Sequence, residues 1–436
     1  MRLRTRYEDN GEKHMKKALA VAISGTLLGS SGAYAAVSDA DFAELKAQMA
    51  AMAKRLSTLE AENQQLKEST SDSVQQLEGA REELSVVKGD LAMVKKQEEA
   101  SSWAERIKWK GDFRYRYEEI KQDDNAKRDR DRIRARAELI AKVTDTTVVG
   151  LGLATGGDDP VSTNQTLGGG GSTKDLRLDL AYFTWTGIED TALTAGKFKN
   201  PYYVEHKSQL IWDGDFRPEG AALQWAADNF FANGTYSYIE SDSNTDDKAF
   251  WGLQVGANFD LLDTVKLTAA VGYLDFPTQD LPSIYDDDFF GNSTVIVNGE
   301  EVYEYDYNLY HGSLGLGFEV FDMPLAVYGD YVQNDDADDY DTGYIAGIQL
   351  GKAKGKGSWQ LQYQYEQLDA NATLGLVTDS DFMGGGTDAE GSKYSAAYML
   401  DDNWSLAATY YDGNTGVDLG NDDKYRRLQL DTYFKY

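Results

Sequence analysis

From residue 107 to residue 436, the chain is built of segments of about ten residues in which apolar and polar side chains alternate. A period of two is the pattern of a β-strand with one apolar and one polar face. We assign sixteen strands to residues 107–119, 130–143, 146–155, 174–186, 191–198, 219–227, 229–240, 248–259, 263–274, 306–320, 324–333, 342–353, 357–368, 391–400, 403–412 and 424–436. The pattern therefore predicts an all-β fold.

The connections between these strands alternate between short and long along the whole chain. Short turns such as 144–145 and 401–402 separate longer loops such as 156–173, 199–218 and 275–305. A soluble sandwich has no reason to keep this order, whereas a transmembrane β-barrel has short turns at one end and long loops at the other. We therefore expect a closed transmembrane antiparallel β-barrel of about 16 strands.

Tryptophan positions agree with this orientation. Trp109, Trp225, Trp359 and Trp404 fall on the expected outward face of their strands, next to the short turns. An indole ring prefers the membrane–water interface, where its apolar body and its single N–H are both satisfied. Trp185 lies at the same level but falls on the inward phase, unless a β-bulge intervenes.

Arginines mark the inward face of the barrel. An arginine that faces lipid at the bilayer midplane costs about 2–4 kcal/mol, so these side chains are expected to face the lumen. They form a predicted basic wall that lines the pore: Arg114, Arg116, Arg132, Arg134, Arg136 and Arg177. A second interpretation is that they pair with nearby carboxylates such as Glu118, Glu138 and Asp179 and hold the wall together. Both can be true.

One long loop differs from the others in composition. Residues 199–218 include the apolar side chains Leu210, Ile211 and Trp212 beside two tyrosines. A loop this apolar is expected to pack against another part of the protein, and the barrel interior is the nearest candidate.

The N-terminus has the features of an export signal. Lys16 and Lys17 form a basic start, residues 18–28 form an apolar core, and Ala33-Tyr34-Ala35 fits the small-x-small cleavage rule. We expect residues 1–35 to be an N-terminal extension and signal peptide, removed on export. Met1 and Met15 are alternative start codons.

Residues 36–100 are predicted to form a coiled-coil domain that precedes the barrel domain 101–436. A heptad repeat runs through residues 40–97 and predicts one long N-terminal α-helix. Its a positions are Leu45, Met52, Leu59, Leu66, Ser73, Ala80, Val87 and Val94, and its d positions are Met49, Leu56, Asn63, Thr70, Leu77, Leu84 and Leu91. Seven unbroken heptads favour a coiled coil over an amphipathic helix that lies on a globular domain. The mixture of Leu, Met and Val at the a and d positions does not decide how many helices form the coiled coil.

Composition excludes several classes of function. The net charge is −30, which disfavours binding to nucleic acid, and the chain has no cysteine for thiol catalysis, disulfides or zinc. The sequence predicts no cofactor and no metal site. Acidic runs such as Asp286-Asp287-Asp288 are interpreted as solvated loop tips, with divalent cations as the alternative. A hydrolase would rely on His206 beside Ser208, but no triad pattern accompanies them, so we expect no enzyme.

The final ten residues, Arg427 to Tyr436, alternate in polarity up to a terminal aromatic. This ending resembles the C-terminal strand of outer-membrane β-barrels, where assembly machinery reads the aromatic. With the signal peptide, the coiled coil and the sixteen strands, residues 36–436 resemble the general porins of Gram-negative outer membranes, and the nearest likeness is the Putative porin family. The resemblance implies a homotrimer and a third outer loop that narrows the pore. By position, Glu205, Asp213 and Asp215 match the acidic residues of that constriction loop.

The expected function is an outer-membrane porin, with its coiled coil in the periplasm, that forms a water-filled channel for passive diffusion of small hydrophilic solutes and ions. Its other expected partners are outer-membrane lipid, lipopolysaccharide and, through the C-terminal strand, the barrel assembly machinery. A basic wall favours anions and acidic loops favour cations, so the sequence leaves the ion preference of the channel open. The alternative function is a structural tether that links the outer membrane to the cell wall through the coiled coil.

Overall fold

The computed structural model describes residues 40, 43–44, 46–59, 61–66, 104–123, 125–241, 247–420 and 422–436. The predicted signal peptide lies outside these residues, as does most of the predicted coiled-coil domain. The chain divides into two units, Met1–Gln97 and Glu98–Tyr436. Within the first unit, the described residues 46–59 and 61–66 are helical, which agrees with the predicted helix, and the coiled coil itself stays a prediction. No helix in the described residues is long and apolar enough to cross a bilayer.

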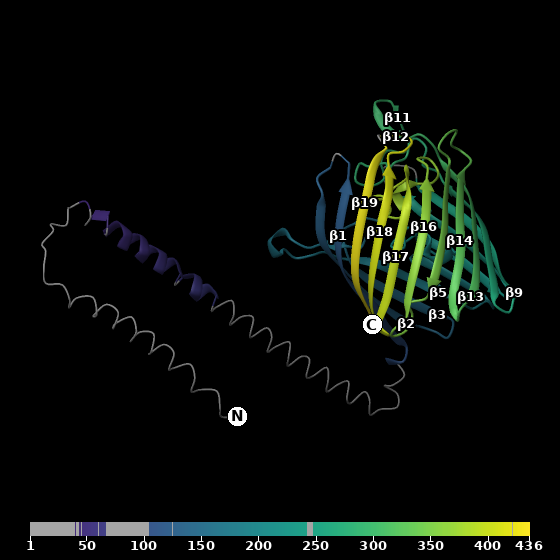
Figure 1. Cartoon of the computed structure of the whole chain (residues 1–436), viewed down its shortest axis with the longest axis horizontal. Coiled ribbons are helices and arrows are strands. Elements are labelled where there is room, and N and C mark those ends of the chain that lie inside the picture. The colour runs from purple at the N-terminus through teal and green to yellow at the C-terminus, as the bar shows by residue number, and fades with distance from the viewer. Residues whose placement is uncertain are drawn as a thin grey trace, which may run out of the picture. The chain divides into compact units, whose positions relative to one another are not determined.

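The second unit is a β-barrel (Figure 1). Its transmembrane-length strands are β1 (Ile107–Gln122), β2 (Arg128–Lys142), β3 (Thr147–Thr155), β5 (Leu176–Trp185), β6 (Thr191–Lys197), β7 (Glu219–Ala227), β8 (Phe230–Glu240), β9 (Lys248–Leu262), β10 (Val265–Phe276), β13 (Tyr307–Val320), β14 (Met323–Asn334), β15 (Thr342–Gly351), β16 (Trp359–Leu368), β17 (Ala389–Asp401), β18 (Trp404–Thr415) and β19 (Asp423–Lys435). These are the sixteen predicted strands, with ends that differ from the predictions by a few residues.

Shorter elements lie in the long loops. They are β4 (Gln165–Thr166), which pairs with β2, the hairpin β11 (Thr294–Val297) and β12 (Glu300–Tyr303), and the 3-10 turns η1 (Gly169–Gly171), η2 (Glu205–Lys207) and η3 (Gly375–Val377). We call the side of the barrel that carries these loops the loop end. The side with the short turns is the turn end.

The barrel is closed because the last strand pairs with the first. β19 runs antiparallel to β1, with Phe434 opposite Phe113 and Thr432 opposite Tyr115, and the two strands lie side by side in Figure 1. The terminal residue extends this pairing, since the backbone N–H of Gly111 donates to the carbonyl of Tyr436 at 2.9 Å. The predicted closure of the barrel is therefore confirmed.

Alternation along each strand sorts the side chains into an outward and an inward set. The four tryptophans predicted to face outward are exposed, and Trp404 stacks on Phe434 with 5.3 Å between ring centroids. On β14, for example, Val327 and Tyr331 are exposed while Tyr328 and Asp330 are buried inside. An exposed apolar band on a closed barrel is what a lipid-facing surface requires.

A β-bulge explains the one tryptophan that did not fit the pattern. The register between β3 and β5 shifts where Gly152 faces Leu180 and Leu153 faces Leu178, so Asp179 is the extra residue. A bulge places two successive residues on the same face and reverses the alternation beyond it. Trp185 is therefore exposed on the outside with the other tryptophans.

Candidate functional site in the barrel lumen

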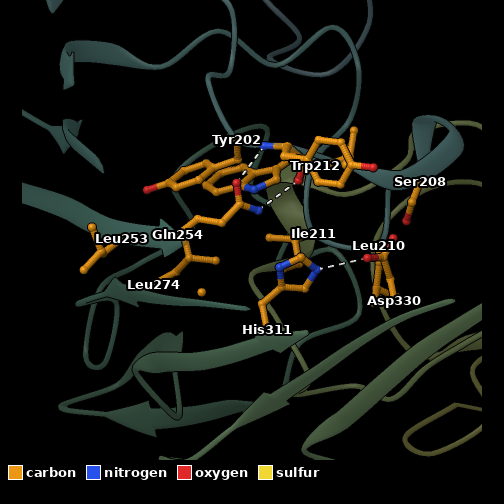
Figure 2. Close-up of a pocket in the computed structure, with 13 residues that line it drawn as sticks. Tyr202, Ser208, Leu210, Ile211, Trp212, Leu253, Gln254, Leu274, His311 and Asp330 are labelled. Atoms are coloured by element: carbon orange, nitrogen blue, oxygen red, sulfur yellow. Dashed lines mark hydrogen bonds and ion pairs between the residues drawn. The ribbon is translucent and has the colours of Figure 1, made fainter. Parts of the chain in front are cut away.

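Loop 199–218 enters the barrel, as its apolar composition predicted. Trp212 stacks on Tyr202 with 5.7 Å between ring centroids and packs against Phe250 and Phe276, which are inward residues of β9 and β10. Figure 2 shows Tyr202 and Trp212 beside Gln254, with the hydrogen bond between His311 and Asp330 below them. The loop is thus anchored on the wall that runs from β8 to β14.

A second loop also enters the barrel, which the sequence analysis did not predict. Residues 369–388 connect β16 to β17, and most of them are buried. Asp381 accepts one hydrogen bond from Arg116 and one from Arg427, each at 2.7 Å, so its carboxylate joins β1 to β19. Burial alone would raise the pKa of Asp381, but the charges of Arg116 and Arg427 hold it well below its usual range.

The two loops bind each other inside the lumen. The backbone N–H of Asp213 donates to the carbonyl of Val377 at 2.7 Å, and the N–H of Ser380 donates to the Asp213 carboxylate at 2.9 Å. Burial, followed by the neighbouring carboxylate of Asp379, raises the pKa of Asp213 well above its usual range. Asp213 therefore faces loop 369–388 and not the basic wall.

Apolar side chains from these loops and from loop 277–306 pack together on one side of the lumen. The cluster combines Tyr202, Leu210, Ile211 and Trp212 with inward residues of β9 to β16 and with Tyr303, Ala372, Leu374, Leu376 and Val377. Such a cluster is a protein core placed inside a barrel, and its close packing excludes water from the space that it fills. The cavities that continue from the loop end to the turn end lie along the opposite, charged wall.

Asp215 is the loop carboxylate that meets the predicted basic wall. It lies 2.7 Å from Arg136, 3.7 Å from Arg134 and 3.8 Å from Arg217. Burial would raise the pKa of Asp215, but these three guanidinium groups outweigh it and lower the pKa. Glu205, the third predicted acidic residue, lies across the lumen beside Gly315 and accepts a hydrogen bond from the Tyr203 hydroxyl.

The predicted basic residues have different surroundings. Arg116 is buried in ion pairs with Asp381 and Asp431, and Arg134 is buried in ion pairs with Asp112 and Asp215. Arg132 lies 3.7 Å from Glu118, and Arg114 donates to Asn164 at 2.5 Å. Arg177 is half exposed beside Asp175. Arg136 and Arg177 line the two cavities described next. The structure therefore brings pairing and lining together on the same wall.

Two cavities lie along this charged wall. The loop-end cavity has a volume of about 940 Å³ and the turn-end cavity about 600 Å³. Asp179 and Arg217 are the two residues that line both cavities. Their side chains form an ion pair at 3.3 Å, and Arg217 is 7% exposed. This pair is the boundary between the cavities and the candidate narrow point of the lumen.

Local backbone features place both partners there. The bulge in β5 turns Asp179 inward next to Leu180. Arg217 ends loop 199–218 and donates from Nη1 to the carbonyls of Gly214 and Phe216 at 2.9 and 3.0 Å, which fixes the direction of its side chain. Sequence reasoning named Asp179 only as a local carboxylate and did not name Arg217, because neither the bulge nor the loop path has a sequence signature.

His206 and Ser208 have structural contacts that account for both residues. The His206 ring lies 3.2 Å from Gln349 and stacks on Tyr328, while Ser208 is buried. Across the described ranges, no group of three or more His, Asp or Glu side chains is arranged to hold a metal ion.

Comparison with known proteins identifies the family. The family model described as Putative porin matches residues 121–282 and 280–415, and no curated protein sequence matches. Among solved structures, the chain is similar to OprB of Pseudomonas putida (11% identity, TM-score 0.52, 78% of this chain and 96% of that chain). It is also similar to OmpF of Salmonella typhi (12%, 0.48, 76% and 97%) and to an OmpT loop mutant of Vibrio cholerae (14%, 0.46, 76% and 99%). At these identities the likeness concerns the barrel fold alone, whereas the family model covers most of the barrel. The chain belongs to the Putative porin family.

Proposed function

We propose that this protein is an outer-membrane porin through which small hydrophilic solutes and ions diffuse passively. Membership of the porin family and the closed barrel support the proposal. The observation that carries it is the pair of cavities on the charged wall, which meet at Asp179 and Arg217. Loops that filled the whole lumen would leave no such path.

The path proposed here is narrower than an open barrel of this size. Sixteen strands enclose an aqueous lumen by geometry, but the core formed by the loops takes up one side of it. A solute would pass along the charged wall, from one cavity to the other past the Asp179–Arg217 pair that lines both. Opposite charges that face each other across a narrow point orient dipolar solutes and disfavour apolar ones.

Residues 36–100 are proposed to form a periplasmic coiled coil that joins copies of this chain, three in a homotrimer. Its support is a row of exposed apolar side chains on the described helix, among them Met49, Met52, Leu56 and Leu59. These residues occupy the predicted a and d positions, and a row of this kind is buried when helices pair. We also propose outer-membrane lipid and lipopolysaccharide as surroundings, and the barrel assembly machinery as the partner of β19.

Planar-bilayer recording of the purified full-length protein tests this function. Discrete conductance steps are expected, and they are expected to persist when residues 40–100 are deleted, because the path lies within the barrel. A folded protein that inserts without conducting would contradict the proposal and favour the tether, whose barrel needs no open path.

A further inference from the structure

The carboxylates on the wall of the turn-end cavity each form ion pairs with cationic side chains of the protein. Asp112 accepts from Arg136 at 2.8 Å and from Arg134 at 3.2 Å. Glu138 is shared by two lysines, with Lys199 at 2.8 Å and Lys110 at 3.2 Å. One carboxylate cannot neutralise two ammonium groups, so this part of the wall has surplus positive charge.

Two further lysines add to the surplus. Lys207 and Lys435 both line the turn-end cavity, and within the described residues neither forms an ion pair with a carboxylate. Lys435 stands over the ring of Tyr433 at 5.7 Å, a contact that leaves its charge uncompensated. Two side-chain carboxylates remain on this lining: Asp179 pairs with Arg217 at 3.3 Å, and Asp213 is directed at the backbone N–H groups of Ser380 and Asp215.

Loop 199–218 holds Lys207 in place. His206 and Lys207 have φ angles of 43° and 63°, in the left-handed region that non-glycine residues rarely adopt. The packing of His206 on Tyr328 and of Ser208 inside the barrel keeps the backbone in this conformation. Lys207 also lines a second cavity at the turn end, whose lining has the lysines Lys266, Lys352 and Lys393 and the carboxylates Asp263 and Glu319.

We infer that the turn-end cavity is a binding site for small oxyanions, carboxylates or phosphates, and that the channel prefers anions to cations. The inference rests on the proposed function, because a solute must reach the lumen. In a cavity walled by low-dielectric protein, a group of unpaired ammonium charges attracts an anion more strongly than it would in bulk water. Partial burial, then the charges of Lys435, Lys393 and Arg134, lower the pKa of Lys207, and a bound anion would relieve this repulsion.

The loop-end cavity has the opposite balance. Its lining has five carboxylates and three cations: Asp179, Asp215 and Glu219 are paired, the last with Lys197 at 2.6 Å, whereas Asp158 and Asp159 form no ion pair within the described residues. Anion preference is therefore set at the turn end, after a solute has passed Arg217.

The test uses the full-length protein in planar bilayers with a KCl gradient. The wild-type reversal potential is expected to have the sign of chloride preference, and inorganic phosphate added at the turn end is expected to reduce the chloride current. Replacing both unpaired lysines (K207E with K435E) is expected to lower the chloride-to-potassium permeability ratio by at least about fivefold, equivalent to about 1 kcal/mol, and to abolish the phosphate effect.

The matched control reverses two lysines of a turn at the same end of the barrel, outside the cavities (K354E with K356E), and is expected to leave the ratio unchanged. A wild type that conducts with cation preference would overturn the inference while leaving the proposed function intact. An equal permeability ratio in the cavity variant and the control would also overturn the inference and leave the proposed function intact. A milder pair (K207Q with K435Q), which removes charge without reversing it, is expected to lower the ratio less, and it gives the result if the double reversal does not fold.

Discussion

At the scale of single residues, the lumen is organised by a few charged side chains that come from distant parts of the sequence. Asp179 is turned inward by a bulge, and Arg217 is aimed at it by backbone carbonyls. Alternation alone predicts that Arg116 and Arg134 lie on the inward face of their strands, and in the structure both are buried in ion pairs. Their partners could not be predicted, because the Arg116–Asp381 pair joins residues 265 positions apart.

Replacing Arg217 with alanine is expected to increase the single-channel conductance, because its guanidinium group lies between the two cavities. The variant leaves Asp179 without its ion-pair partner, so a shift of selectivity toward cations is expected as well. The measurement is single-channel recording in symmetric salt, followed by a salt gradient. Arg177→Ala is the control, since this residue lines only the loop-end cavity and is half exposed. Equal conductance in wild type and Arg217→Ala would mean that the narrow point lies elsewhere.

At the scale of elements, all sixteen strands could be predicted from the sequence, because alternation is a local signal that each segment carries by itself. Loop 199–218 was also predicted to enter the barrel, from its apolar side chains. Loop 369–388 contains Leu374, Leu376 and Val377, which give the same signal more weakly, and the loop was overlooked among the acidic connections. Which wall each loop contacts depends on the packing of three loops together, and no single segment encodes it.

Asp381→Asn is expected to loosen loop 369–388, because it removes the charge that both Arg116 and Arg427 face. Loss of one charged hydrogen bond costs about 1.5–3 kcal/mol. The folded-state pKa of Asp381 is depressed, so its stabilising contribution is present above its unfolded pKa of about 3.9 and is lost only as the pH falls through the lower folded value. At neutral pH the variant should therefore show faster proteolysis within the loop and a lower unfolding temperature.

Asp286→Asn is the matched control for this experiment, since Asp286 is an exposed residue of loop 277–306. A difference between wild type and Asp381→Asn that disappears only at strongly acidic pH is expected. If it disappeared near pH 6 instead, the carboxylate would not be held ionised by the two arginines.

At the scale of the whole molecule, the lumen has two unlike halves. One half holds an apolar core built on β9 to β16, with a separate cavity at its turn end, and the other is a charged path along the wall from β1 to β7. The barrel, its closure and its apolar outer band follow from sequence patterns. The division of the lumen does not, because it arises only after the loops have folded back into the barrel and met each other at Asp213 and Ser380.

The central claim is that solutes pass along the charged half of the lumen. Thiol modification of single-cysteine variants tests this claim most directly. The chain has no native cysteine, so one residue can be introduced at a time. Gly157 lines the loop-end cavity and has open space where a Cβ would be added, Gly214 lines the turn-end cavity, and Ala372 is 0% exposed in the apolar core. A charged, water-soluble thiol reagent is expected to reduce the single-channel current through Gly157→Cys and Gly214→Cys and to leave Ala372→Cys unchanged. Full modification at both glycine positions without any change in current would contradict the account.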